Sequence, residues 1–256
     1  MNALLLAAGY ATRLYPLTEN FPKALLEIGE KTVLDRLIDQ IQDTRECQTI
    51  CLVTNDRFYP HFDQWLHQRQ RYGGDSNIVI VSDGTSLNEL RLGAIGDLDF
   101  VLNHRDFVNF GSDDLLICGC DNLLGLDFRE LFGFFYRDRQ PVVAVHQEAD
   151  SSRLNKVGVV VLGDNGFVKE MEEKPAQPKS DIVTCPIYIY PPDALALIPH
   201  YLGESYNCDA PGHFLSWLVR NRPVRAFIFH QPVYALDSFD MYHWLRDNAE
   251  RLFLTD

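Results

Sequence analysis

The chain has 256 residues, of which 46% are hydrophobic, and its formal net charge at pH 7 is −13. This length suits one large α/β domain, and the negative charge argues against non-specific binding to nucleic acid, which attracts basic surfaces. No apolar run reaches the length of a membrane span, and the chain enters its first strand without a secretory leader. We therefore expect a cytoplasmic protein that binds neither nucleic acid nor membrane; a homo-oligomer is left open.

Strand-like and helix-like patterns alternate along the first half of the chain. The first four expected strands are rich in β-branched residues and leucine, which is typical of central parallel strands buried on both faces. The order predicts an α/β fold with a doubly wound, Rossmann-like mixed sheet in a single domain. The expected strands are Ala3–Leu6, Thr49–Val53, Ile78–Val81, Leu115–Cys118, Val142–Val145, Val157–Leu162, Ile182–Tyr190 and Arg225–Phe229.

The expected helices begin with a capping box at Thr32-Val33-Leu34-Asp35, which opens an amphipathic stretch. A second helix is marked by Leu87, Leu90, Ala94, Ile95, Leu98 and Val101. Further helices are expected over Phe128–Arg137, Asp193–Leu202, His213–Asn221 and Ser238–Leu252. Between residues 157 and 173 the pattern indicates a hairpin that turns at Gly163-Asp164-Asn165-Gly166, because Asn-Gly is a strong turn signal. The most loop-like stretch, residues 71–77, is too short to separate domains.

A turn of small residues follows the first strand and is itself followed by two cations, Arg13 and Lys23. Ligands of doubly wound sheets bind beyond the carboxyl ends of the strands, and small residues let backbone N–H groups approach a polyphosphate. Arg13 can hold phosphate oxygens in a bidentate fork, and Lys23 adds a compact charge. The turn is neither a Walker loop nor a dinucleotide fingerprint. From the residues alone, an ordinary strand-to-helix turn with surface cations stays equally open.

The stretch LAAGYATRLYPLTENFPKALLEIGEKTVLDRLI resembles the N-terminal signature of the sugar-phosphate nucleotidyltransferases, or NDP-sugar pyrophosphorylases, such as the glucose-1-phosphate thymidylyltransferases. Their pattern is L-A-A-G-x-G-T-R-L-x-P-L-T followed by P-K-x-L-L-P-I; Ala11 replaces a glycine and Glu27 a proline. The resemblance implies a GT-A-like nucleotidyltransferase fold, with a nucleotide-binding half over about residues 1–125 and an acceptor-binding half over about residues 126–256. It also implies that Arg13 and Lys23 are catalytic. The nucleotide-binding residues it implies are Leu6, Ala7, Ala8, Gly9, Tyr10, Ala11 and Thr12.

The segment after the third strand differs from the family, which has a Gln followed by G-x-A-x-A-L there. This chain has Ser82-Asp83-Gly84-Thr85-Ser86 and continues to Ala94. Gly84, Thr85 and Ser86 can offer backbone and hydroxyl contacts to a nucleobase, and Asn88 or Arg91 can reach substrate. Thr85 or Ser86 can equally cap the next helix, so the sequence selects no base.

Two aspartates are the expected ligands of Mg²⁺. Asp121 follows the buried strand at residues 115–118, where the family has a metal-binding Gly-Asp and this chain has Gly-Cys-Asp. Asp237 lies in a segment that resembles the family's W-x-D-I-G-T-P-E, although Asp237 or Ser238 can also be the N-cap of the last helix. Two carboxylates suffice, because phosphates and water supply the remaining ligands of Mg²⁺. The six cysteines are scattered and fit no disulfide or zinc framework.

The acceptor side is assigned by the resemblance of residues 167–175 to the family's V-x-x-F-x-E-K-P. Glu173 and Lys174 then contact the sugar and its phosphate, and Gly158, in the match to Y-G-V-V, lies close to the sugar. The resemblance therefore implies nucleotidyl transfer from a nucleoside triphosphate to a phosphorylated small-molecule acceptor, with a sugar 1-phosphate as the default. A cytidylyltransferase for a small alcohol phosphate or phosphonate, or a catalytically silent regulatory relative, are the alternatives.

Overall fold

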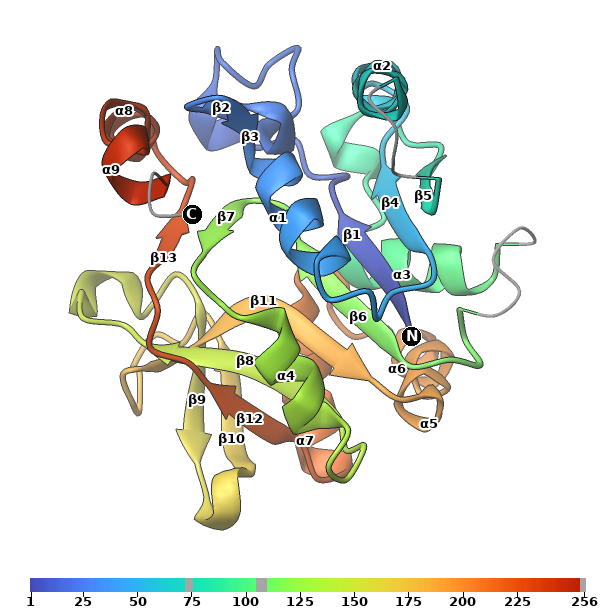
Figure 1. Cartoon of the computed structure of the whole chain (residues 1–256). Helices are drawn as coiled ribbons and strands as arrows, with labels where there is room; N and C mark the ends of the chain where they lie inside the picture. The colour runs from blue at the N-terminus through green and yellow to red at the C-terminus, as the bar shows by residue number, and fades with distance from the viewer. Residues whose placement is uncertain (72–75, 105–109, 254–256) are drawn as a thin grey trace. The chain divides into compact units, whose positions relative to one another are not determined.

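The computed structural model describes residues 1–71, 76–104 and 110–253, so part of the loop expected at residues 71–77 lies outside the described residues. The chain forms two compact units built from interleaved segments (Figure 1). The first unit comprises Met1–Leu4, Leu92–Cys118 and Asp127–His230, and the second comprises Leu5–Arg91, Gly119–Leu126 and Gln231–Asp256. The division of the chain into two functional halves near residue 125 stays a prediction.

Most strands of the first unit lie next to β11 (Ile182–Tyr190), which pairs antiparallel with β6 (Leu115–Gly119), β8 (Val142–Gln147) and β9 (Gly158–Leu162). Beyond these, β12 (Arg225–Ile228) runs parallel to β8, and β10 (Val168–Glu173) runs antiparallel to β9. The hairpin expected between residues 157 and 173 is confirmed. Its turn contains Asn165 in the left-handed conformation, with φ 60°.

In the second unit, β4 (Ile50–Thr54) pairs in parallel with β5 (Ile78–Ser82), which is the edge strand. Every residue of β4 is buried, as expected for a central strand, whereas three of the five residues of β5 are half-buried, which corrects the expectation for that strand. The remaining long strand, β1 (Asn2–Leu6), contributes residues to both units. The predicted α/β class with a mixed sheet is confirmed.

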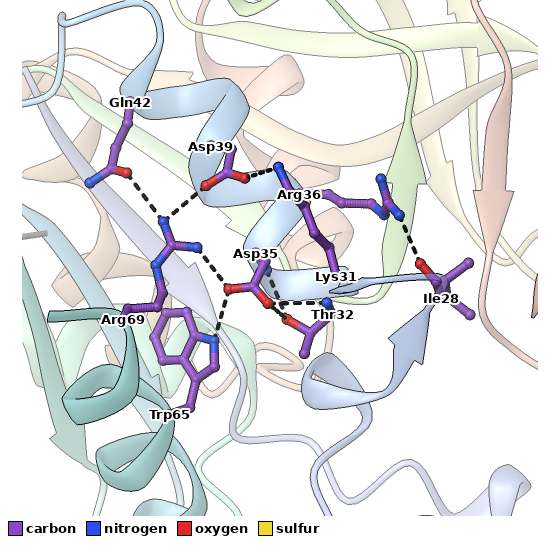
Figure 2. A network of polar contacts seen from close by, with 9 residues as sticks. All are labelled: Ile28, Lys31, Thr32, Asp35, Arg36, Asp39, Gln42, Trp65 and Arg69. Carbon is purple, nitrogen blue, oxygen red and sulfur yellow. Dashed lines mark hydrogen bonds and ion pairs between the residues drawn. The ribbon is translucent and has the colours of Figure 1, made fainter. Parts of the chain in front are cut away.

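The capping box expected at the start of α1 (Val33–Gln42) is present, because Thr32 Oγ1 accepts from Asp35 N at 3.0 Å and Thr32 N donates to Asp35 Oδ2 at 3.0 Å. The sequence did not predict α2 (Tyr59–Gln70), which buries only Phe62 and Trp65 and so shows a weak helical periodicity. Figure 2 shows how the two helices are joined: Asp35 accepts hydrogen bonds from Trp65 and Arg69, and Arg69 also bonds Asp39.

The helix expected over residues 87–101 is shorter than predicted. Its first residue is Ala94, in α3 (Ala94–Leu102), and Leu87 and Leu90 lie outside it with 55% and 62% of their surface exposed. Gly93 precedes α3 with φ 77°, and a Cβ there would lie 2.5 Å from the carbonyl oxygen of Cys208. A larger residue would therefore clash with backbone, and this glycine fixes the start of the helix.

The other helices lie near their predicted positions, but two expected helices are broken in two. In the first unit they are α4 (Phe128–Phe135), α5 (Pro192–Leu195), α6 (Ile198–Gly203) and α7 (Pro211–Asn221), and in the second they are α8 (Phe239–Asp247) and α9 (Ala249–Phe253). The first break falls just before Pro199, which lacks an N–H group and suits a first helical turn. No helix among the described residues is long and apolar enough to cross a membrane.

Two short ladders complete the second unit. One joins β2 (Glu27–Ile28) to β3 (Lys31–Thr32), and the other joins β7 (Asn122–Leu124) to β13 (Val233–Ala235). Leu14, Leu123 and Leu236 are almost completely buried in one hydrophobic cluster of this unit, which α8 also enters. Each buried leucine side chain is worth about 1.5–3 kcal/mol. These leucines therefore anchor the segments around residues 13, 121 and 237.

Candidate active site

An open pocket of about 240 Å³ lies in the second unit, at the meeting point of three chain segments that are far apart in the sequence. It is lined by the four charged residues that the sequence analysis expects to be catalytic or metal-binding, which are Arg13, Lys23, Asp121 and Asp237. The other residues that line it are Ala11, Thr12, Leu14 and Leu236. Their roles stay predictions, but their convergence is a finding of the structure.

The carbonyl groups of the loop after β1 point into the protein. Asn55, which is fully buried, donates from Nδ2 to the carbonyl oxygen of Ala8 at 2.9 Å. Thr18 Oγ1 donates to the carbonyl oxygen of Ala11 at 2.8 Å. Neither Asn55 nor Thr18 was singled out from the sequence, because buried polar residues that hold a loop leave no local pattern. Together they fix the path of the loop.

Unlike the carbonyl groups, three backbone N–H groups of the same loop have no hydrogen-bond partner among the described residues. Within the part of the chain that the structure describes, the backbone N–H groups of Gly9, Tyr10 and Ala11 donate no hydrogen bond. Ala11 adopts the left-handed conformation, with φ 47° and ψ 43°. Successive N–H groups at such a turn form a concavity that binds anions. The loop is therefore built to offer donors, beside an exposed Arg13.

Lys23 lines the same pocket as Ala11 and Thr12 and lies in the short 3₁₀ turn Lys23–Leu25. Its Nζ atom donates to Asp121 Oδ2 at 3.1 Å. The lysine side chain is only 15% exposed, whereas that of Asp121 is 50% exposed. The ammonium group is thus held in place by its carboxylate partner, and the carboxylate keeps a face open to the pocket.

The register of the β7–β13 ladder explains why Asp121 and Asp237 are neighbours. Asn122 pairs with Ala235, and one step further the N–H of Leu236 donates to the carbonyl oxygen of Asp121 at 3.1 Å. The two aspartates therefore lie at the same end of the ladder. With three residues per strand and more than a hundred residues between them, this pairing left no signal in the sequence.

The structure also shows which of Asp237 and Ser238 is the N-cap of α8. Ser238 is the N-cap of α8, since its Oγ accepts from Met241 N at 3.2 Å. Asp237 is not the cap, and its side chain lines the pocket. Two carboxylates in one pocket are a donor set that fits Mg²⁺, which needs one or two protein carboxylates when phosphates are present. The described residues contain no cluster of three or more His, Cys, Asp or Glu arranged for a metal ion.

The expected base-reading segment forms a tight loop after β5 in the second unit. Thr85 donates from both N and Oγ1 to Asp83 Oδ1, each at 2.7 Å, and both residues are buried. Thr85 therefore does not cap α3, whereas Gly84, with φ 79°, and Ser86 are exposed. Burial raises the pKa of the Tyr10 phenol, and the nearby Asp83 raises it further. Tyr10, in the loop after β1, therefore lies close to Asp83 in this segment.

Asn88 and Arg91 lie in and just after the 3₁₀ turn Asn88–Leu90 of the second unit. Arg91 is exposed, and its guanidinium donates to the carbonyl oxygen of Asn88 at 3.0 Å. Neither residue lines the pocket that holds Arg13 and Lys23.

The acceptor residues form a separate group in the first unit. Gly158 begins β9 and pairs with Glu173, the last residue of β10. Lys174 has a left-handed backbone, with φ 49°, and its Nζ lies 3.8 Å from Glu173 Oε1. Burial raises the pKa of Glu173, and this effect outweighs the lowering by Lys174. A largely buried acid and a half-exposed cation are therefore held side by side.

Two residues at the start of α7, Gly212 and His213, belong to this group and were missed from the sequence. A Cβ on Gly212 would lie 1.9 Å from Glu173 Oε2. Burial lowers the pKa of His213, and Lys174 lowers it further while Asp209 opposes the change. No periodicity or motif marks these positions, because their importance comes from the packing of α7 on β10.

The comparison with protein families agrees with this geometry. The model of the family described as nucleotidyl transferase matches residues 2–223. The chain belongs to the nucleotidyl transferase family. The match includes Arg13, Lys23 and Asp121, whereas Asp237 lies beyond it, so that its assignment rests on the pocket.

Relatives of this nucleotidyl transferase are named for several nucleotides. A UTP–glucose-1-phosphate uridylyltransferase of Haloferax volcanii is 27% identical over 75% of this chain and 72% of its own length. A glucose-1-phosphate thymidylyltransferase of Streptomyces griseus is 29% identical over 89% of this chain and 60% of its own length. The chain spans about half the length of several other curated relatives.

The fold is shared with solved structures over almost the whole chain. A UDP-glucose pyrophosphorylase in complex with UDP-glucose has a TM-score of 0.77 and 18% identity, and the alignment covers 98% of each chain. At this identity the likeness shows the fold alone. It confirms the nucleotidyltransferase type of α/β fold that the sequence predicted.

Proposed function

We propose that this nucleotidyl transferase forms a nucleoside-diphosphate sugar and pyrophosphate from a nucleoside triphosphate and a sugar 1-phosphate. The observation that carries the proposal is the convergence of Arg13, Lys23, Asp121 and Asp237 on one pocket, beside a loop with unused N–H donors. The names of the relatives support a sugar 1-phosphate as acceptor, because the uridylyl- and thymidylyltransferases are both named for glucose 1-phosphate.

The reaction is an in-line displacement at the α-phosphorus. An oxygen of the acceptor phosphate forms a bond to the α-phosphorus, the bond from that phosphorus to the bridging oxygen breaks, and pyrophosphate leaves with the electron pair. No covalent enzyme intermediate is needed, since positioning and charge neutralisation supply most of the rate.

The residues of the pocket divide this work. The N–H groups of the loop and the guanidinium of Arg13 hold the β- and γ-phosphates and the leaving pyrophosphate. Lys23, fixed by Asp121, offsets negative charge at the reacting phosphate. Asp121 and Asp237 would hold Mg²⁺, which neutralises phosphate charge and orients the phosphates when bound.

The acceptor is assigned to the first unit. Glu173 accepts hydrogen bonds from sugar hydroxyl groups, and the ammonium of Lys174 binds the phosphate of the acceptor. Lys174 is well suited to this because half of its side chain is exposed while its backbone is fixed by a hydrogen bond from its N–H to the carbonyl oxygen of Val157 at 3.1 Å.

The test is pyrophosphate release by the purified protein with Mg²⁺, each of ATP, CTP, GTP, UTP and dTTP, and a panel of sugar 1-phosphates, glycerol phosphate and a phosphonate. We expect release with at least one pair and the matching nucleoside-diphosphate sugar as co-product. Release only with CTP and glycerol phosphate or a phosphonate would show that the acceptor is not a sugar 1-phosphate and would favour the cytidylyltransferase alternative. No release with any pair would leave a catalytically silent relative.

A further inference from the structure

Glu173 is unusually confined for a glutamate at the end of a strand. Its side chain is only 10% exposed, and its Oε1 atom faces Lys174. Its Oε2 atom lies toward two glycines, one on each side. An ideal Cβ on Gly158 of β9 would be 3.0 Å from Oε2, and one on Gly212 of α7 would be 1.9 Å from it. The carboxylate therefore occupies the space that a side chain at Gly212 would fill, whereas a Cβ on Gly158 would first meet Met171 Cε and Thr184 Oγ1, each at 2.6 Å.

The backbone does not require glycine at position 212. Its φ is outside the left-handed range that favours glycine, and it lies in the first turn of an eleven-residue helix, after Pro211. Alanine is a better helix former than glycine, so helix stability alone favours alanine here. The contact of Glu173 with this turn is what explains a glycine at this position.

The helix and the strand cannot easily separate to admit a side chain. Ser216 of α7 donates to the carbonyl oxygen of Met171 on β10 at 2.8 Å, and α7 packs along β10. The atoms that a Cβ on Gly212 would meet are the carboxylate of Glu173 and, at 2.9 Å, Cε of Met171. Both are the ends of flexible side chains. The carboxylate, rather than the helix, would give way.

We infer that Gly212 is a positioning residue of the acceptor site, which holds the Glu173 carboxylate against the first turn of α7 and in line with Lys174. The inference rests on the proposed function, since it assigns to Glu173 the sugar of the acceptor. The first turn of a helix carries exposed N–H groups and partial positive charge, which opposes part of the rise in the pKa of Glu173 that burial causes. A carboxylate of fixed orientation selects acceptors by the placement of their hydroxyl groups.

The test is a double-mutant cycle of Gly212→Ala and Glu173→Ala, with kcat and KM measured separately for the sugar 1-phosphate and the nucleoside triphosphate. We expect Gly212→Ala to lower kcat/KM for the sugar 1-phosphate on the order of 10²-fold, as a misplaced positioning group does, and to leave KM for the triphosphate unchanged. In the Glu173→Ala background the same substitution should have no further effect, because the group it displaces is gone.

Gly133→Ala is the matched control, since Gly133 lies in the exposed face of α4 and a Cβ there would meet nothing within 4 Å. It should leave all kinetic constants unchanged, and neither alanine variant should lower the unfolding temperature. Wild-type kinetics in Gly212→Ala, or an equal loss in both backgrounds, would overturn the inference and leave the proposed function standing. An inactive wild type would overturn both.

Discussion

Ala11 adopts a left-handed backbone conformation, which residues other than glycine rarely take, at the position where the family signature has glycine. The left-handed conformation destabilises an alanine by about 1–2 kcal/mol, and glycine would remove this strain. Part of the gain is offset because glycine loses more conformational entropy on folding. We therefore expect Ala11→Gly to raise the free energy of unfolding by about 0.5 kcal/mol, measured by urea denaturation, and to keep activity.

A matched control is Ala196→Gly, because Ala196 is exposed and has a right-handed backbone, with φ −61°. This variant should lose stability, by up to about 1 kcal/mol. If Ala11→Gly destabilised the protein as Ala196→Gly does, the left-handed conformation of Ala11 would be contradicted.

At Glu173, the ionised side chain that the proposed function requires lowers the stability of the fold. Burial raises its pKa, so between the unfolded and folded pKa values the native state binds more protons than the unfolded state, and stability falls as the pH rises through this window. Glu173→Gln cannot ionise. We expect it to unfold at a higher temperature than wild type at pH 7, with the difference shrinking toward pH 4, while kcat/KM for the sugar 1-phosphate falls. An unfolding temperature at pH 7 that is equal to or below that of wild type would refute this prediction.

At the scale of elements, the polar network between α1 and α2 is the main link between two helices of which only one was predicted (Figure 2). Asp35 Oδ1 accepts from Trp65 Nε1 at 3.0 Å and from Arg69 at 2.7 Å, and Oδ2 accepts from Thr32. Burial acts to raise the pKa of Asp35, but these hydrogen bonds outweigh it and the pKa is lowered. The stabilisation is present above the unfolded pKa and is lost as the pH falls through the folded one.

We expect Asp35→Asn to cost about 2 kcal/mol in urea denaturation at pH 7, because an amide with one acceptor oxygen leaves buried donors unsatisfied. Asp39→Asn is the control, since Asp39 is more exposed and its pairs with Lys31 and Arg69 are of the kind worth about 0–1 kcal/mol. Equal losses of stability in the two variants would contradict the greater contribution that we assign to Asp35.

The elements also show where the sequence was and was not informative. The buried strands and α1 have strong apolar patterns and a capping box, and they were predicted to within one or two residues. Helix α2 was missed because most of its surface is polar, and Leu87 and Leu90 were wrongly placed on a buried helix face because apolar spacing cannot show that Gly93 begins the helix. Local pattern fails where a backbone contact or one polar network decides the boundary.

At the scale of the whole molecule, the sequence predicted the family and six of the residues that line the pocket, but not what brings them together. The signature around Arg13 and Lys23 is local and could be recognised. The neighbourhood of Asp121 and Asp237 depends on the β7–β13 ladder, and that of Glu173 and Gly212 on the packing of α7, both of which join distant segments. Such contacts follow from the fold, so they became visible only in the structure.

We propose that nucleotidyl transfer takes place in the pocket around Lys23. This proposal is tested most directly by the turnover of Lys23→Ala beside that of Lys31→Ala, a control whose lysine is exposed and pairs with Asp39. We expect Lys23→Ala to lose turnover by 10²-fold or more with its fold intact, as loss of such a clamp does, and Lys31→Ala to match wild type. Unaltered turnover in Lys23→Ala would show that the reaction takes place elsewhere.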